Sequence, residues 1–296
     1  MGVILGALEA KGLLVSDGAW GTMLQAKGMT SDDCPEEWNL SHAEDVQAVA
    51  SAYAEAGSDI ILTNTFGGSL LKLAKMGHGE KVVDYNRAGA ANSLAAAGDA
   101  IVAGSVGPTG EFIEPLGEMT AAEMEAVFSE QIGAMLDAGL RAICVETMSA
   151  IEEAACAVRA AKHLDATVDV ITTFTFNASP KGFKTMMGVG PEQVVATMGE
   201  AGADVLGSNC GNGIEQMVDI AKAFREHTDM PLLIHANAGV PELIGGKTVF
   251  RQSPEDMAAR VGELVAAGAN IVGGCCGTTP MHISAMKAAI ADLENS

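Results

Sequence analysis

Basic residues are scarce in this sequence. The chain has 17 Lys and Arg against 38 Asp and Glu, which gives a formal net charge of −21. Proteins that bind nucleic acid neutralise its phosphates with clustered basic residues, and anionic membrane surfaces attract the same kind of cluster. The charge balance therefore argues against both partners, and we read the acidic surface as a solubility feature.

Long apolar runs are also missing. No uninterrupted run approaches the roughly 20 residues that span a bilayer, and the first 14 residues show neither a basic start nor a clear cleavage site for a signal peptide. Six cysteines in 296 residues do not make a dense disulfide framework, and the adjacent pair Cys275 and Cys276 suits a reducing compartment. We therefore expect a cytoplasmic protein.

One short phrase occurs four times in the chain. Each copy has the end of an alanine-rich helix, a glycine that stops the helix, and a β-rich run. The copies lie at residues 55–61, 137–143, 200–206 and 266–272. The same pattern predicts eight strands, at residues 13–16, 59–63, 100–105, 140–145, 168–174, 203–208, 232–236 and 269–272. Amphipathic helices are expected between most of them, for example at 43–56, 121–138 and 254–267.

Eight strands that alternate with helices over about 250 residues favour a closed (β/α)8 TIM barrel over an open doubly wound sheet. No linker or low-complexity stretch divides the chain, so we expect a single α/β domain over residues 1–296. Active sites of such barrels lie at the carboxyl ends of the strands. The uncommon residues of this sequence follow the expected strands at that end.

Three cysteines belong to this set. Cys275 and Cys276 lie between glycines after the eighth expected strand, where a turn can direct both thiols to one point, and Cys210 follows the sixth. A lone cysteine is more often a buried packing residue, which is how we read Cys144 and Cys156. Three cysteines at strand ends instead form the ligand set of a catalytic zinc with one open position.

Other polar residues at the strand ends allow more than one reading. Glu146 ends an apolar strand, where it is costly unless paired, so it could hold a substrate ammonium group or a neighbouring Lys or Arg. Asp17 is ambiguous in the same way. Backbone N–H groups in the stretch Gly104-Ser105-Val106-Gly107 could bind a carboxylate, or these residues could form an ordinary glycine-rich turn. His235 and Asn237 are expected to face the barrel interior.

These motifs resemble those of the homocysteine S-methyltransferases. The likeness covers nearly the whole chain, from residues 17–22 (Asp-Gly-Ala-Trp-Gly-Thr) through 64–66 and 146–147 to 273–277 (Gly-Gly-Cys-Cys-Gly). It implies a (β/α)8 barrel that holds Zn²⁺ through three cysteines and binds homocysteine as a thiolate in the fourth position. The matching ligands are Cys210, Cys275 and Cys276.

The resemblance also implies roles for other residues. Asn237 matches an asparagine that can fill the fourth zinc position of related methionine synthases without substrate. Asp17 and Glu146 match acidic residues that hold the ammonium group of the amino acid. The full set of candidate substrate-binding residues is Asp17, Asn64, Ser105, Val106, Gly107, Glu146 and Asn237.

The methyl donor is less determined by the sequence. Family members use betaine, S-methylmethionine or a methylated cobalamin. A quaternary ammonium such as betaine is usually held by an aromatic cage, and this chain has two Trp and two Tyr. The stretch 17–25 resembles most closely the homocysteine-binding module of cobalamin-dependent methionine synthase. We therefore favour a methylcorrinoid on a separate protein.

Two other functions fit the same residues. A zinc methyltransferase of a corrinoid system could act on a different thiol or on a small methylated compound. A non-catalytic subunit of a methyltransferase complex could use zinc to hold the barrel mouth closed, although an open coordination position argues against this reading. No nucleic acid or membrane partner is expected, and the sequence does not predict an oligomeric state.

Overall fold

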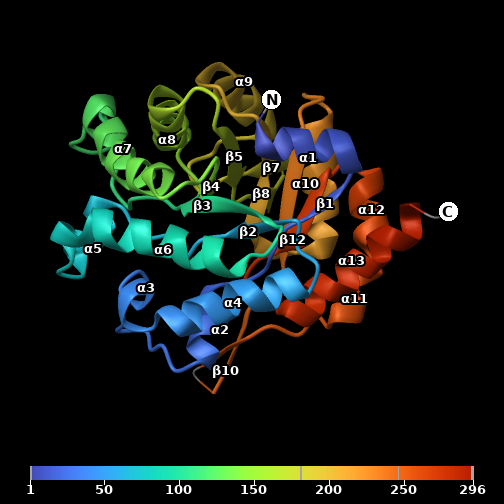
Figure 1. Cartoon of the computed structure of the whole chain (residues 1–296). Helices are drawn as coiled ribbons and strands as arrows, with labels where there is room; N and C mark the ends of the chain where they lie inside the picture. Colours follow the sequence, from blue (N-terminus) through green and yellow to red (C-terminus); the bar gives the residue numbers. More distant parts are fainter. Residues whose placement is uncertain (1, 181, 246, 295–296) are drawn as a thin grey trace.

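The computed structural model describes residues 2–180, 182–245 and 247–294 as one α/β barrel (Figure 1). The barrel strands are β1 (Leu14–Val15), β2 (Ile60–Leu62), β3 (Ile101–Val106), β4 (Ala142–Met148), β5 (Asp169–Phe174), β8 (Val205–Gly213), β9 (Leu232–Asn237) and β12 (Ile271–Gly274). The helices around them are α4 (Ala43–Glu55), α6 (Val82–Ala96), α7 (Ala121–Asp137), α8 (Ile151–Leu164), α9 (Pro191–Ala201), α10 (Ile214–Arg225), α11 (Pro254–Ala258), α12 (Val261–Ala266) and α13 (Pro280–Glu294).

The eight strands are parallel and run in the order β1-β12-β9-β8-β5-β4-β3-β2. The ring closes between its end strands through a bridge from Ser16 to Ile60. Two backbone hydrogen bonds flank this bridge: Asp17 N donates to Ile60 O at 3.0 Å, and Asp59 N donates to Val15 O at 2.6 Å. The expected (β/α)8 architecture is confirmed.

The repeated glycines end helices as predicted. Gly57, Gly139, Gly202 and Gly268 have φ values of 94°, 112°, 98° and 103°, a left-handed conformation that glycine adopts at little cost. The chain can therefore leave each helix sharply and enter the next strand within a few residues. One expected helix differs, because residues 254–267 form two short helices, α11 and α12, instead of a single helix.

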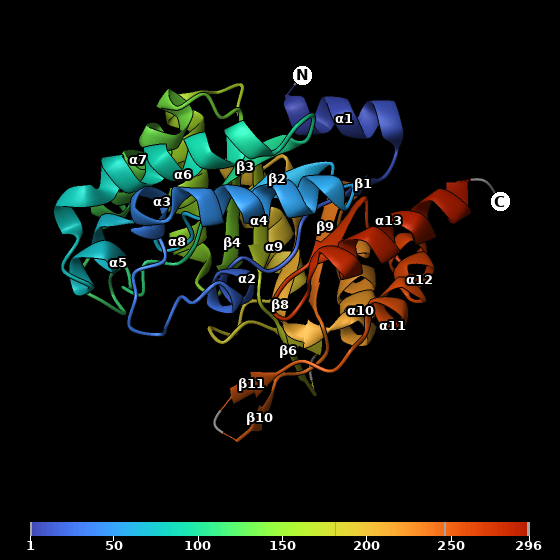
Figure 2. The ribbon, with the colours of Figure 1, turned by 60° about the horizontal axis from the view of Figure 1, so that its bottom comes forward.

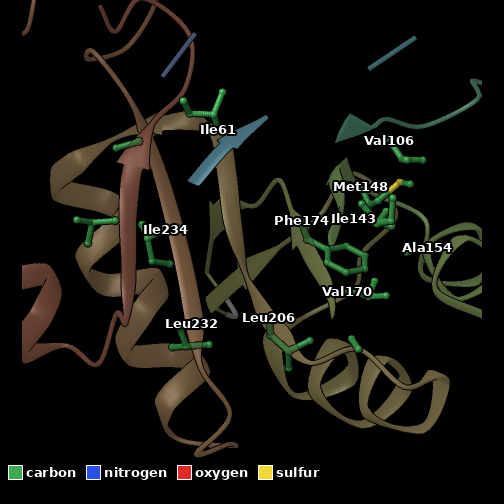
Figure 3. Packing of buried hydrophobic residues seen from close by; sticks show 14 of the residues in the cluster. Ile61, Val106, Ile143, Met148, Ala154, Val170, Phe174, Leu206, Leu232 and Ile234 are labelled. Carbon is green, nitrogen blue, oxygen red and sulfur yellow. The ribbon is translucent and has the colours of Figure 1, made fainter. Parts of the chain in front are cut away.

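Alternation along the strands separates two apolar layers. Ile143 and Val145 pack outward against the helices, while Cys144 packs inside the barrel with residues such as Ile171 and Leu233. Successive side chains of a strand point to opposite faces, which explains this division. Figure 3 shows part of the outer layer, with the ring of Phe174 among its aliphatic neighbours.

The two ends of the barrel are built differently. Helix α1 (Val3–Lys11) covers one end, where Ile4 joins the inner apolar cluster and its N–H donates to Asp169 Oδ2 at 2.6 Å. The hairpins β6–β7 (Asn177–Ser179 and Gly182–Lys184) and β10–β11 (Glu242–Ile244 and Lys247–Val249) extend from the opposite end (Figure 2). Short helices α2 (Gly21–Ala26), α3 (Trp38–Ser41) and α5 (Leu70–Lys75) follow β1 and β2. None of the helices in the described residues has the length and apolar character of a membrane span.

Candidate metal centre and substrate cavity

The same alternation determines which polar side chains enter the barrel at its open end. Residues two positions beyond the interior residues Ala103, Cys144 and Leu233 are Ser105, Glu146 and His235, so these three point inward at the carboxyl ends of their strands. His235 is 2 % exposed. Asn237 follows two residues later on the same face and is also 2 % exposed, in agreement with the prediction for both residues.

Three sulfur atoms converge at this end. The Sγ atoms of Cys210, Cys275 and Cys276 all lie within 4.8 Å of one another, and Cys210 Sγ lies 3.8 Å from Cys276 Sγ. Cys210 has a φ of 61°, a conformation that is uncommon outside glycine and that directs its thiol toward the other two. A hydrogen bond stabilises the turn that holds the cysteine pair: Thr278 Oγ1 donates to Cys275 O at 2.7 Å.

Hydrogen bonds among the three thiols shift their pKa values in opposite directions. Hydrogen bonds from Cys275 and Cys276 lower the pKa of Cys210 to about 3, and a hydrogen bond from the Asn237 side chain acts in the same direction. Donation to Cys210 raises the pKa of Cys276 to about 11 and that of Cys275 well above its ordinary value. One thiolate is therefore stabilised among two neutral thiols, and a cation is needed before all three can ionise together.

The geometry fits a metal ion. With a Zn–S distance of about 2.3 Å, two sulfurs of a tetrahedral site lie roughly 3.8 Å apart, which is the spacing between Cys210 and Cys276. Asn237 Oδ1 is buried and has no hydrogen-bond partner. Buried polar atoms are nearly always partnered, so an amide oxygen left free beside three thiols is consistent with a fourth ligand position.

The sulfurs lie in a cavity of about 630 Å³. Glu146 also lines it, and its carboxylate accepts hydrogen bonds from Ser105 Oγ at 2.5 Å and from Asn209 Nδ2 at 3.2 Å. Burial raises the pKa of Glu146 to about 7. No Lys or Arg pairs with it among the residues that the structure describes, which favours the reading of Glu146 as a site for a substrate cation.

The remaining predicted residues differ in their access to the cavity. Asn64 and Ser105 line it. Asp17 is fully buried; Oδ2 of its carboxylate accepts hydrogen bonds from Trp20 Nε1 and Leu62 N, both at 2.8 Å. Burial raises the pKa of Asp17 to about 6.

The expected group of free N–H donors is not formed. Ser105 N donates to Thr63 Oγ1 at 3.0 Å, and Gly107 N donates to Phe66 O at 2.9 Å. Val106 is fully buried in the outer apolar layer. Two of the proposed donors are therefore already occupied, and Ser105 offers the cavity its hydroxyl group instead.

Several cavity residues were not predicted from the sequence. Trp20, Phe66, Lys72 and Lys75 line its outer part, because α2 and α5 fold over the barrel mouth. Asn209 lies beside Glu146 and immediately before Cys210. Asn209 lies two residues after Gly207, and side chains two positions apart on a strand share one face. This spacing would have predicted that Asn209 points into the barrel.

Cys34, Cys144, Cys156 and His282 are not among the residues that line the cavity. Cys144 and Cys156 are fully buried, as predicted, and Cys34 is a loop residue that is 2 % exposed. His282 lies in the first turn of α13. Its Nδ1 accepts a hydrogen bond from Thr279 N at 3.1 Å, and its Nε2 contacts Gln252 O at 3.0 Å. It supports the loop after the cysteine pair without reaching the cavity.

The fold and the site together define a (β/α)8 barrel with a candidate metal centre of three cysteines and a carboxylate without a basic partner in one cavity. The chain belongs to the homocysteine S-methyltransferase family, whose sequence profile matches residues 14–290. The resemblance seen in the motifs is thus confirmed, and the non-catalytic alternative is not supported by membership in this enzyme family.

Known relatives agree with this assignment. The sequence is 31 % identical to methionine synthase of Mycobacterium tuberculosis over 306 residues, which covers 95 % of this chain and 25 % of that protein. It is 30 % identical to methionine synthase of Mycobacterium leprae over 304 residues, covering 95 % and 24 %. The chain therefore spans about a quarter of the length of these relatives. The crystal structure of the metallated homocysteine methyltransferase MmuM from Escherichia coli shares the fold, with a TM-score of 0.79, 24 % identity, and coverage of 96 % of this chain and 98 % of that one.

Proposed function

We propose that this chain transfers a methyl group from an activated donor to the thiol of homocysteine and forms methionine. The observation that carries this proposal is the presence of three convergent thiols and the unpaired Glu146 carboxylate in one cavity. An amino acid with a thiol side chain presents a sulfur and an ammonium group to these two features. The catalytic unit is the barrel as a whole, residues 1–296.

Cys210, Cys275 and Cys276 would hold Zn²⁺, and Asn237 would occupy the fourth position in the absence of substrate. The bound ion would supply the positive charge that keeps a substrate thiol deprotonated near neutral pH, since a free thiol has a pKa of about 8.5. During transfer, the substrate sulfur forms the new S–CH₃ bond. The bond between the methyl carbon and the donor breaks, and its electron pair leaves with the donor.

The protein groups around this reaction bind and orient the substrate. Glu146 accepts the ammonium group, and Ser105 keeps the carboxylate of Glu146 in place. Asp17 adds negative charge behind the cavity wall and orients Trp20, whose ring lines the cavity. Asn64 lines the cavity near β2 as a further substrate contact, while Val106 and Gly107 are not among its lining residues.

The proposed donor is a methylcorrinoid carried by a separate protein. Betaine carries the methyl group on a quaternary ammonium group, which proteins usually bind in an aromatic cage. Trp20 and Phe66 are the aromatic residues among the described cavity-lining residues, which is less than an aromatic cage for a quaternary ammonium requires.

A donor panel tests this function. Zinc-loaded protein is incubated with homocysteine and with methylcobalamin, betaine or S-methylmethionine, and methionine is quantified by mass spectrometry, with C210S treated identically as control. We expect methionine from methylcobalamin and none with the variant. Turnover with betaine or S-methylmethionine instead would overturn the corrinoid donor. Absence of methionine with every donor, when zinc content is confirmed, would contradict homocysteine methylation itself.

A further inference from the structure

Asn209 makes an unusual number of contacts for a residue outside the predicted metal site. It is fully buried and lies on β8 directly before Cys210. Its Nδ2 donates to Glu146 Oε2 at 3.2 Å and to Thr147 Oγ1 at 2.8 Å. Its Oδ1 accepts from Thr147 N and from Thr173 Oγ1, each at 2.8 Å. The side chain thus joins three neighbouring strands, β4, β5 and β8.

These contacts fix the orientation of the amide. A backbone N–H only donates, so the bond from Thr147 N requires an oxygen at that position, and the nitrogen must then face Glu146. A carboxylate accepts this hydrogen bond and cannot supply one when ionised. Asn209 therefore donates to one of the two oxygens of Glu146 and holds it in place.

The backbone on both sides of this bond is held in a costly conformation. Thr147 has a φ of 63° and Cys210 a φ of 61°. For a branched residue such as threonine, positive φ is a genuine outlier, and such outliers persist where surrounding contacts over-determine them. Asn209 contacts Thr147 through two side-chain bonds and Cys210 through the chain itself. Asn209 thus links the position of the Glu146 carboxylate to that of Cys210.

The triad is also within reach of the amide. Asn209 Nδ2 lies 3.9 Å from Cys275 Sγ, so the same group that holds Glu146 lies against a second cysteine. No other residue that the structure describes is shown with bonds to Glu146 and a thiol of the triad together. Asn209 therefore contacts both the carboxylate assigned to the substrate amine and a thiol assigned to the metal.

We propose that Asn209 is a positioning residue that selects α-amino thiols, because it fixes Glu146 relative to Cys210 and Cys275. This inference rests on the proposed function, since it takes Glu146 as the amine site. It predicts that loss of the Asn209 side chain weakens binding of homocysteine far more than binding of 4-mercaptobutyrate, which has the same thiol and carboxylate but lacks the amine.

The test uses binding instead of turnover. Protein loaded with Co²⁺ is titrated with each thiol, and the sulfur-to-metal absorption band reports the dissociation constant. For N209A, we expect the dissociation constant of homocysteine to rise about tenfold or more. The dissociation constant of 4-mercaptobutyrate should change by no more than about twofold. T173V removes a single bond to Asn209 Oδ1 with little change of volume, and we expect a smaller shift in the same direction.

The matched control is N212A. Asn212 belongs to the same strand and is 5 % exposed, but its Nδ2 donates to Phe176 O at 2.7 Å and it does not contact Glu146. Its ratio of the two dissociation constants should equal that of the unaltered protein. Metal content and melting temperature, measured for every variant, identify any variant that does not fold. If N209A does not fold, the ratio of the two dissociation constants in T173V tests the proposal.

The two claims fail in different ways. If homocysteine does not perturb the band of the unaltered protein, the proposed function fails. If homocysteine binds there, but the Asn209 and Thr173 variants lose affinity for both thiols equally or for neither, the positioning role of Asn209 is overturned. A selective loss for homocysteine supports it.

Discussion

Cys210 Sγ lies 3.8 Å from Cys276 Sγ, although 66 positions separate them in the sequence. The first thiol ends the inward-facing part of β8, and the second follows β12, with β9 between these two strands. The two thiols therefore come from strands that are one strand apart at the carboxyl end of the barrel, so residues distant in the sequence line one cavity.

Removal of one thiol should abolish tight zinc binding. In C210S, a neutral hydroxyl replaces a thiolate ligand, so we expect zinc affinity to fall by at least about two orders of magnitude. The measurement is competition with a chromophoric chelator, with zinc quantified by mass spectrometry. C156A serves as control because Cys156 is buried in α8, away from the triad. Undiminished affinity in C210S would show that the thiols do not act together.

Glu146 should determine affinity for the substrate amine. The variant E146Q keeps the size of the side chain but removes its charge and replaces one acceptor oxygen with an amide NH₂ group. We expect the dissociation constant of homocysteine to rise about 10- to 100-fold, the loss of a charge-assisted hydrogen bond worth about 1.5–3 kcal/mol. E153Q is the control, because Glu153 is a buried glutamate bonded to Thr109 outside this cavity. Equal effects of both variants would refute the assignment.

The pH dependence of binding follows from the same carboxylate. Because burial raises the pKa of Glu146 to about 7, the group is charged above pH 7 and neutral below it. Affinity for the ammonium group should therefore be retained above pH 7 and fall by up to about tenfold per unit below it. The affinity for homocysteine is divided by the affinity for 4-mercaptobutyrate at each pH, because this ratio cancels the titration of the thiol group that both compounds carry. A ratio that stays flat from pH 8 to 5.5 would contradict this role.

Asp59 should stabilise the closure between β1 and β2. Its carboxylate accepts bonds from Val15 N at 2.9 Å, from Lys11 Nζ at 2.6 Å and from Lys287 Nζ at 2.7 Å. Because the lysines are partly exposed, their ion pairs count for less than the buried backbone bond. In D59A, we expect the free energy of unfolding to fall by about 1–3 kcal/mol at pH 7.

The acid limb of the stability curve provides a second check on Asp59. Burial opposes ionisation of this carboxylate, but the bonds from Lys11 and Lys287 outweigh it and lower the pKa. The stabilisation is thus present above the unfolded value of about 3.9 and disappears as the pH falls through the lower folded value. Urea denaturation at several pH values measures the free energy of unfolding of the unaltered protein and of D59A. The difference between the two values should become smaller only below pH 4. D137N, at an exposed pair with Arg87, should stay within about 0.5 kcal/mol of the unaltered protein.

The barrel and the cysteine triad were predictable from local patterns. Helix-ending glycines such as Gly57 and Gly268 and the β-rich runs after them are local properties of the sequence, so the eight strands were found. Cys275 and Cys276 stood out because neighbouring residues on a strand cannot share one face. Two strands extend beyond their predicted ends: β8 continues through Cys210 to Gly213, and β4 includes Glu146.

The contacts around the triad depended on tertiary structure. The role of Asn209 arises from partners on β4, β5 and the turn after β12, which the sequence does not bring together. The occupied N–H groups of Ser105 and Gly107 likewise depend on Thr63 and Phe66, from another strand and its loop. Local sequence predicts which residues reach a strand end, and only the folded barrel shows which of their atoms remain free.

X-ray absorption at the zinc edge tests the central claim most directly. In the zinc-loaded protein without substrate, we expect three sulfur ligands from the cysteines and one light-atom ligand such as Asn237 Oδ1. Addition of homocysteine should increase the sulfur count to four, because its thiolate takes the fourth position. A count that remains at three in the presence of saturating homocysteine would contradict thiol activation at this site.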